Sequence, residues 1–203
     1  MKQTLQEQFG AIDIYLFDQL LKGRIRPGMR VVDAGCGQGR NLLYLLREGY
    51  EVFGIDLSSE AVEEVRLLAS MIAPELPAEN FKVEAVEAIS LPNKFADVMV
   101  SNTVLHFARD DEHFYAMLGA MWRVLKPGGM FFCRLASSIG MEPQRCLGGR
   151  RYLMHDGTER YLVDQAMLLR VTEELGGELL EPLKTTVVQD LRCMTTWVVR
   201  KGG

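Results

Sequence analysis

The chain has 203 residues and a mass of 22.9 kDa, which suffices for one domain with a full core but not comfortably for two. Apolar residues make up 48% of it and charged residues 25%, and no uncharged apolar stretch reaches the length of about eighteen residues that spans a bilayer, so we expect a soluble globular protein. A formal net charge of −4 and a pI near 5.5 argue against non-specific binding to nucleic acid.

The spacing of cysteines and histidines excludes further classes of protein. The four cysteines are scattered without a paired CxxC spacing, which is typical of free thiols in a reducing compartment. The N-terminal residues include acidic side chains, which a signal peptide lacks. The three histidines show no metal-ligand spacing such as HExxH. We therefore expect a cytoplasmic protein without a metal site.

Strand and helix signals alternate along the first two thirds of the chain. Residues 1–23 predict an amphipathic helical region, part of an N-terminal helical cap over residues 1–28. Strands are predicted over residues 30–34, 51–56, 81–85, 96–101 and 130–135. The clearest helix covers residues 110–125, and the segment Lys126-Pro127-Gly128-Gly129 ends it and turns into the fifth strand.

The last third of the chain departs from this alternation. Residues 137–163 contain four glycines with little periodicity, which predicts an irregular insertion that serves as a substrate lid or acceptor wall. A helix over residues 164–175 is followed by strands over residues 178–188 and 195–200, too close together for a parallel crossover, so these strands form an antiparallel hairpin. The predicted fold is α/β: one domain over residues 1–203 with a doubly wound, mostly parallel, seven-stranded, Rossmann-like sheet that ends in a C-terminal antiparallel hairpin strand.

A glycine loop of the pattern GxGxG follows the first strand, from Asp33 to Gly39. Glycines let a ligand approach the backbone there, and Asp56 at the end of the second strand can accept hydrogen bonds from two ribose hydroxyls. A dinucleotide loop needs a third glycine where this chain has Arg40. Asp33 would repel a pyrophosphate and attract an ammonium or a sulfonium. These residues predict a nucleoside pocket for a ligand with positive charge near the loop.

Several motifs in the same order resemble the class I methyltransferases that use S-adenosylmethionine. The resemblance covers roughly residues 29–135: the loop at Asp33 is similar to the family's first motif, Glu87-Ala88-Ile89-Ser90-Leu91-Pro92 to its adenine-contacting segment, and residues 125–129 to its late turn motif. Glutamate stands at position 87, where the family usually has aspartate. The resemblance implies S-adenosylmethionine as cofactor and S-adenosylhomocysteine as product. The residues that it implies for cofactor binding are Asp33, Gly35, Cys36, Gly37, Asn41, Asp56, Leu57, Glu87, Ala88, Ser101 and Asn102.

The acceptor is less defined than the methyl donor. Family members that methylate exocyclic amines of nucleic-acid bases carry a D/N-P-P-Y/F/W loop, and the loop after Ser101 has neither its prolines nor its aromatic residue. Together with the acidic pI, this favours a small-molecule acceptor and no nucleic acid or membrane partner. A protein or RNA methyltransferase and a non-catalytic S-adenosylmethionine-binding module are the alternatives. The sequence leaves the oligomeric state open.

Candidate acceptor-side residues come from the later loops. If the acceptor must lose a proton, the candidates for a general base are, in order of preference, His106, His113 and Tyr152. A packed loop histidine is the alternative interpretation for the first of them. The candidates for holding a carboxylate or phosphate of the acceptor are Arg145, Arg150 and Arg151, which as scattered loop arginines could equally be solvated.

Overall fold

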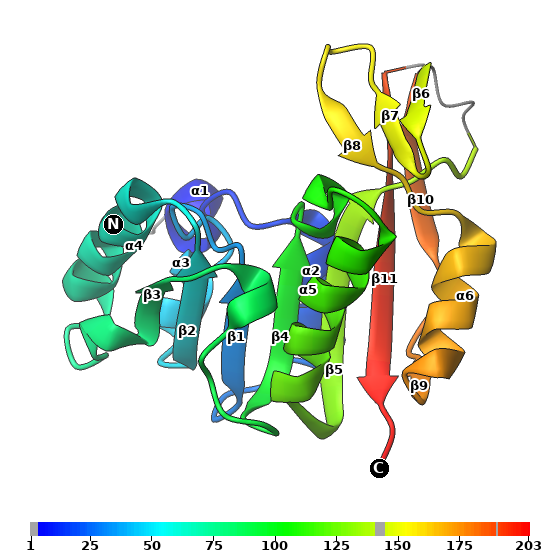
Figure 1. The fold of residues 1–203 in the computed structure, drawn as a ribbon. Coiled ribbons are helices and arrows are strands. Elements are labelled where there is room, and N and C mark those ends of the chain that lie inside the picture. The colour runs from blue at the N-terminus through cyan, green and yellow to red at the C-terminus, as the bar shows by residue number, and fades with distance from the viewer. Residues whose placement is uncertain (1–3, 141–144, 190) are drawn as a thin grey trace.

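The computed structural model describes residues 4–140, 145–189 and 191–203, and its centre is a twisted sheet (Figure 1). The sheet order is β10 (Lys184–Val188), β11 (Arg192–Lys201), β5 (Leu125–Ala136), β4 (Ala96–Asn102), β1 (Arg30–Ala34), β2 (Glu51–Asp56) and β3 (Phe81–Val83). Strand β11 runs antiparallel to both of its neighbours, and the pairs from β5 to β3 are parallel. The predicted mostly parallel sheet of seven strands with an antiparallel strand near the C-terminus is therefore confirmed.

Helices cover both faces of this sheet. Helices α5 (Asp111–Val124) and α6 (Gln165–Glu174) pack with one face in a cluster of buried apolar side chains. The opposite face packs against α2 (Ile14–Leu21), α3 (Leu43–Arg47) and α4 (Ser59–Ile72), and short α1 (Leu5–Phe9) contacts α3. Single 3-10 turns occur at η1 (Ala78–Asn80), η2 (Val86–Ala88) and η3 (Leu105–Phe107). Because both faces are covered, β1 is buried without alternation along almost its whole length, including the acid Asp33.

Two predicted boundaries are wrong near the C-terminal half of the sheet. The segment predicted as a turn, residues 126–129, lies within β5, where the register with β4 shifts and Gly128 has a φ of +77°. It is a strand irregularity at the start of a long strand. The strand predicted over residues 178–188 is two strands, β9 (Gly177–Leu179) and β10, both paired with β11. Pro182 lies between them and has no amide hydrogen for a strand ladder.

The insertion over residues 137–163 is more regular than its glycines predict. Strands β6 (Arg145–Gly148), β7 (Arg151–Leu153) and β8 (Glu159–Tyr161) form a separate antiparallel sheet. Each strand has only three or four residues, too few to give a visible alternation of apolar and polar side chains. Figure 1 shows this small sheet above the carboxyl ends of the parallel strands. The prediction of an irregular segment is therefore wrong, and residues 141–144 of it lie outside the described residues.

Two features are absent from the described part of the chain. No helix there is long and apolar enough to cross a membrane. No group of three or more histidine, cysteine, aspartate or glutamate side chains there is arranged to hold a metal ion.

Candidate active site

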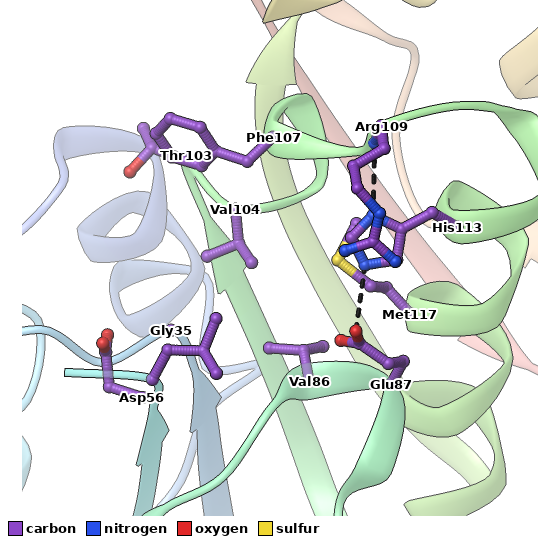
Figure 2. A pocket seen from close by; sticks show the side chains of 11 residues that line it. Gly35, Asp56, Val86, Glu87, Thr103, Val104, Phe107, Arg109, His113 and Met117 are labelled. Carbon is purple, nitrogen blue, oxygen red and sulfur yellow. Dashed lines mark hydrogen bonds and ion pairs between the residues drawn. The ribbon is translucent and has the colours of Figure 1, made fainter. Parts of the chain in front are cut away.

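Two adjoining cavities, each of about 460 Å³, open at the carboxyl ends of the parallel strands. The first is lined by Gly35, Asp56, Leu57, Val86, Glu87, Thr103, Val104, Phe107, Arg109, His113 and Met117 (Figure 2). The second is lined by Arg40, Thr103, His106, Phe107, Arg134, Ala136, Met154, Asp156, Thr158, Arg160, Leu191, Arg192 and Met194. Thr103 and Phe107 belong to both linings, so the cavities meet at the loop after β4.

The glycine loop forms one wall of the first cavity. The amides of Gly35 and Cys36 donate to the carbonyl oxygen of Ile55, over 2.7 and 3.0 Å, which ties the loop to the end of β2. Gly35 has a φ of +84°, and a Cβ atom there would come within 2.2 Å of the Val104 side chain. Only glycine fits both the left-handed conformation and this close approach. The loop therefore presents its backbone to the cavity.

Asp33 lies beneath this loop as a fully buried acid. Neither of its carboxylate oxygens has a hydrogen-bond partner among the residues that the structure describes. Burial raises the pKa of Asp33 to about 7, and Asp56 adds to the rise, while the guanidinium of Arg40 and the side-chain amide of Asn41 oppose it. A buried carboxylate without a partner is costly unless a cation or a proton neutralises it. The site beside the glycine loop is therefore suited to a positively charged ligand.

Asp56 is fixed at the rim of the first cavity by two backbone amides. Its Oδ2 accepts from the amide of Gly37 and its Oδ1 from the amide of Ser58, each over 2.9 Å. A carboxylate has about four acceptor sites, so both oxygens can still accept from a ligand. Leu57 beside it is an exposed apolar side chain, at 73%, in a cavity wall. An apolar face next to a fixed acid fits an adenosine group.

The end of β4 supplies a second group of polar atoms. Asn102 Oδ1 accepts from Arg40 Nη2 over 3.0 Å, while Asn102 Nδ2 and Ser101 Oγ are buried without partners among the described residues. Thr103, the next residue, has a φ of +64°, which is uncommon for a residue with a Cβ. Such backbone strain often marks a ligand site. Asn41, the sequence neighbour of Arg40, is buried, and its Oδ1 accepts from the amide of Asp13 over 3.0 Å.

Residues 32–133, half of the chain, match the family model described as a methyltransferase domain. The chain belongs to this family. The model covers the glycine loop, Asp56 and the loop after β4, so the lining of the first cavity lies wholly in the matched part, whereas nine of the thirteen residues that line the second cavity lie beyond it.

Curated relatives of this methyltransferase domain act on different classes of molecule. An S-adenosyl-L-methionine-dependent Diels-Alderase from Talaromyces variabilis is 35% identical over 107 residues, which cover 51% of this chain and 35% of that protein. A ubiquinone biosynthesis O-methyltransferase from Xanthomonas campestris is 29% identical over 170 residues, 77% of this chain and 68% of that protein. A tRNA 5-carboxymethoxyuridine methyltransferase from Escherichia coli is 22% identical over 171 residues, 80% of this chain and 64% of that protein. The chain thus spans about a third of the first protein and about two thirds of the others.

A solved structure with the same fold holds the product of the methyl donor. It is the 1,6-didemethyltoxoflavin-N1-methyltransferase from Burkholderia thailandensis with bound S-adenosylhomocysteine. The structural match covers 96% of this chain and 80% of that enzyme's chain, with a TM-score of 0.73 and 20% sequence identity. At this identity the likeness shows the fold of the methyltransferase domain, and the roles of individual residues rest on the geometry above.

The candidate bases differ in their surroundings. His113 lies in the first cavity, where its Nδ1 accepts from the amide of Arg109 and its Nε2 lies 3.1 Å from Glu87 Oε1 (Figure 2). Burial by itself raises the pKa of Glu87. Hydrogen bonds from its own backbone and from His113 lower that pKa by more, so the net shift is downward. His106 lines the second cavity, and its Nδ1 accepts from the amide of Ala136 over 3.2 Å. In both histidines the proton therefore lies on Nε2.

The remaining sequence candidates lie in several places. Tyr152 packs against a cluster of four buried apolar residues, Ala136, Met154, Leu162 and Met194. All of these except Leu162 line the second cavity. Arg150 pairs with Asp164 over 2.8 Å, and Arg151 pairs with Glu159. Arg150 and Arg151 line a separate cavity beside the start of α5, and Arg145 is exposed on β6.

Two further cofactor candidates are adjacent to the first cavity. Cys36 is buried, and desolvation raises the pKa of its thiol, so the side chain stays neutral. Ala88 ends η2, whose other two residues line the cavity.

Sequence reasoning missed most of the second cavity. Arg134 had a visible signal, because it is a charged residue near the end of a strand that is otherwise apolar, Met130 to Leu135. Arg160 and Arg192 carry no such signal, since they belong to short or exposed segments that reach the cavity through the tertiary fold. Phe107, 57% exposed at the boundary between the cavities, could have been found as an aromatic residue in the loop after β4.

Proposed function

We propose that this chain is a cytoplasmic S-adenosylmethionine-dependent methyltransferase that acts on a small molecule. The observation that carries the proposal is the buried, unpartnered carboxylate of Asp33 beneath a glycine loop, next to the rim acid Asp56. A sulfonium nucleoside with an ammonium group satisfies both features, whereas a dinucleotide would bring phosphates against Asp33. The four cysteines are free thiols, consistent with a reducing compartment.

The residues of the first cavity fit such a cofactor part by part. Asp56 would accept from the ribose hydroxyls, and Leu57 with the Val86–Ala88 turn would border the adenine. Asp33, Ser101 and Asn102 would hold the charged amino-acid end, since both Asp33 oxygens, Ser101 Oγ and Asn102 Nδ2 are buried without partners in the described chain. When bound, S-adenosylmethionine supplies a methyl group activated by a positively charged sulfur. The chain contributes mainly by holding acceptor and donor in line, an effect that can account for much of the rate.

A small-molecule acceptor is supported by the second cavity. Its volume of about 460 Å³ is within the usual range of ligand pockets, about 300–1,000 Å³, and it adjoins the first cavity at Thr103 and Phe107. The ubiquinone biosynthesis relative supports this class, whereas the tRNA relative supports the alternative of an RNA acceptor. Transfer of labelled methyl groups into small molecules, RNA or protein of a cell extract separates these classes. Cofactor binding without turnover across all three would favour a non-catalytic binding module.

Replacing Asp56 by Ala tests the cofactor site. The substitution removes a charged acceptor of ribose hydrogen bonds and also frees the amide of Gly37. We expect S-adenosylhomocysteine to bind about 1.5–3 kcal/mol more weakly, measured by isothermal titration. Glu79→Ala, at an exposed acid of η1, is the control and should leave the affinity unchanged. Absence of binding to the unaltered protein at high micromolar concentration would contradict the proposed function.

A further inference from the structure

The second cavity has an unusual balance of charge. Among the residues that the structure describes, its lining contains four guanidinium groups, of Arg40, Arg134, Arg160 and Arg192, and one carboxylate, Asp156. The carboxylate is already engaged, because its Oδ1 accepts from the amide of Thr158 over 2.9 Å and from the hydroxyl of the same residue. Hydrogen bonds from Thr158 lower the pKa of Asp156, and the charge of Arg160 adds a smaller lowering. The cavity therefore carries excess positive charge in a protein whose net charge is −4.

The arginines of this cavity are not neutralised equally. Arg134 Nη1 lies 3.2 Å from Asp13 Oδ2, so an acid compensates its charge. Arg160 stacks over the ring of Phe107, with its guanidinium carbon 4.7 Å from the ring centre, and its Nη1 donates to the carbonyl oxygen of its neighbour Glu159. Within residues 4–140, 145–189 and 191–203, no carboxylate lies within 4.0 Å of the guanidinium nitrogens of Arg40, Arg160 or Arg192.

His106 adds a donor to this lining and not an acceptor. Its Nδ1 accepts from the amide of Ala136, so the proton of the neutral ring is on Nε2. Burial, with Arg160 and Arg134 adding to the effect, lowers the pKa of His106 to about 3, so the ring is neutral near pH 7. No described residue accepts a hydrogen bond from Nε2. The imidazole is therefore prepared to donate to a ligand and is not available as a general base without breaking its bond to Ala136.

Arg40 belongs with the cofactor. It donates to Asn102 at the end of β4, and its charge acts on Asp33 beneath the glycine loop. Arg160 and Arg192 come instead from the small sheet and from the start of β11, on the far side of the Thr103–Phe107 boundary from the first cavity. Two guanidinium groups thus remain for the acceptor.

We propose that the methyl acceptor carries an oxyanion, either a carboxylate or a phosphate, which binds in the second cavity to Arg160 and Arg192 with His106 Nε2 as a further donor. The inference rests on the proposed methyl-transfer function. The planar guanidinium fork matches the oxygens of both groups and forms charge-assisted, often bidentate hydrogen bonds. Phe107 holds one face of the Arg160 guanidinium, which reduces the conformational freedom that binding would cost. The acceptor's nucleophile would then lie toward Thr103, where the cavities meet.

A small ligand fits this cavity better than a nucleic-acid phosphate. The arginines line a cavity beneath the small sheet, and the chain as a whole is acidic, whereas nucleic-acid binding needs an extended basic surface. The negative charge of Asp156 in the same lining also reduces the area of positive potential that a ligand would meet.

The test uses titration calorimetry on the full chain saturated with S-adenosylhomocysteine, whose affinity is measured first. Benzoate and phenyl phosphate are the two anionic probes, and benzamide is the neutral probe of matched shape. We expect the unaltered protein to bind at least one anion and not benzamide. Arg160→Gln and Arg192→Gln should each weaken that anion about tenfold or more while leaving the affinity for S-adenosylhomocysteine unchanged. Arg160→Lys should recover part of the loss by restoring the charge without the fork.

Arg26→Gln, at an exposed arginine of the loop before β1, controls for a general effect of lost charge and should change neither affinity. Equal binding of benzamide, or no anion binding to the saturated protein, overturns the inference while the proposed function stands. A parallel loss of S-adenosylhomocysteine affinity in Arg160→Gln would assign the arginines to the cofactor and also overturns it. Displacement of the probes by a short single-stranded RNA at micromolar concentration would assign the arginines to an RNA acceptor and overturns the inference of a small anionic acceptor. If S-adenosylhomocysteine itself does not bind, the proposed function fails, and this inference fails with it.

Discussion

Asp33 is a side chain whose burial is unfavourable for the stability of the free protein but favourable for ligand binding. It is fully buried at the end of β1, and within the described chain its oxygens have no hydrogen-bond partners. In the free protein the group therefore favours its protonated form, which is the reason for its raised pKa. A bound cation would reverse this preference by stabilising the carboxylate. The residue thus couples protonation, stability and cofactor affinity.

The pH dependence of stability follows from this shift. The pKa of Asp33 rises from 3.8 in the unfolded chain to about 7 in the fold, so the unfolded state loses the proton first. We expect the contribution of Asp33 to the free energy of unfolding to be fully present below about pH 4 and lost as the pH rises to about 7. Denaturant titrations of the free protein across this range measure it. Asp33→Asn should remove that part of the slope, and an unchanged slope would contradict the assignment.

The same residue predicts a pH dependence of cofactor affinity. Because the ammonium group of S-adenosylhomocysteine favours the ionised carboxylate, its binding should strengthen as the pH rises through about 7. Isothermal titration on both sides of that pH measures the effect. Asp33→Asn should bind more weakly and lose this dependence, whereas an equal dependence in the variant would assign the titration to another group.

At the scale of elements, the segment from β1 to α4 depends on two glycines of the loop in different ways. Gly37 has a φ of +51° and open space where a Cβ would lie. Gly39 has a φ of +81°, and a Cβ there would come within 2.7 Å of the Val65 side chain on α4. Both positions need the left-handed conformation, but only Gly39 also permits the close packing of the loop on α4.

This difference predicts unequal costs for two alanine substitutions. Gly37→Ala should lower the free energy of unfolding by about 1–2 kcal/mol, the cost of a left-handed residue with a Cβ. Gly39→Ala should lower it by about 1–3 kcal/mol more, because the added methyl overpacks the contact with Val65. Urea denaturation of the two variants side by side measures the difference. Equal losses would mean that α4 moves aside without cost.

At the scale of the whole molecule, Asp13 joins the N-terminal segment to the site. Its Oδ1 accepts from the amides of Tyr15 and Leu16, which caps α2. Its Oδ2 pairs with Arg134 of β5, and its amide donates to Asn41 of the loop after β1. One buried residue thus connects three elements. That residues 1–28 act as a cap over the site remains a prediction.

Replacing Asp13 by Ala should loosen this connection. The substitution removes the α2 cap, which alone is worth about 1 kcal/mol, and leaves Arg134 without its acid. We expect faster amide hydrogen exchange in α2 and a loss of stability greater than the cap accounts for. Thr4→Ala removes only the cap of α1 and is the matched control. Equal exchange of α2 amides in both variants would show that other contacts hold the segment.

The parts of the site that could be predicted are those made by neighbours in sequence. The glycine loop, Asp33 and Asp56 occur at the ends of two adjacent parallel strands, and the geometry of that unit fixes where they point. The element boundaries that failed have a different cause. The turn expected at residues 126–129 is a strand irregularity, because pairing with β4 outweighs the local preference of its proline and glycines.

The sequence by itself determined the alternation of strands and helices, the antiparallel C-terminal hairpin and the cofactor end of the site. Each depends on local periodicity or on residues within one strand-loop-strand unit, where the backbone geometry is nearly invariant. Only the tertiary structure decided which arginines share a cavity. Arg150 and Arg151 pair with nearby acids, while Arg134, Arg160 and Arg192 meet from β5, β8 and β11. The proximity of these three side chains depends on the strand order and on the position of the small sheet. Both are set by long-range packing and leave no pattern in any one segment.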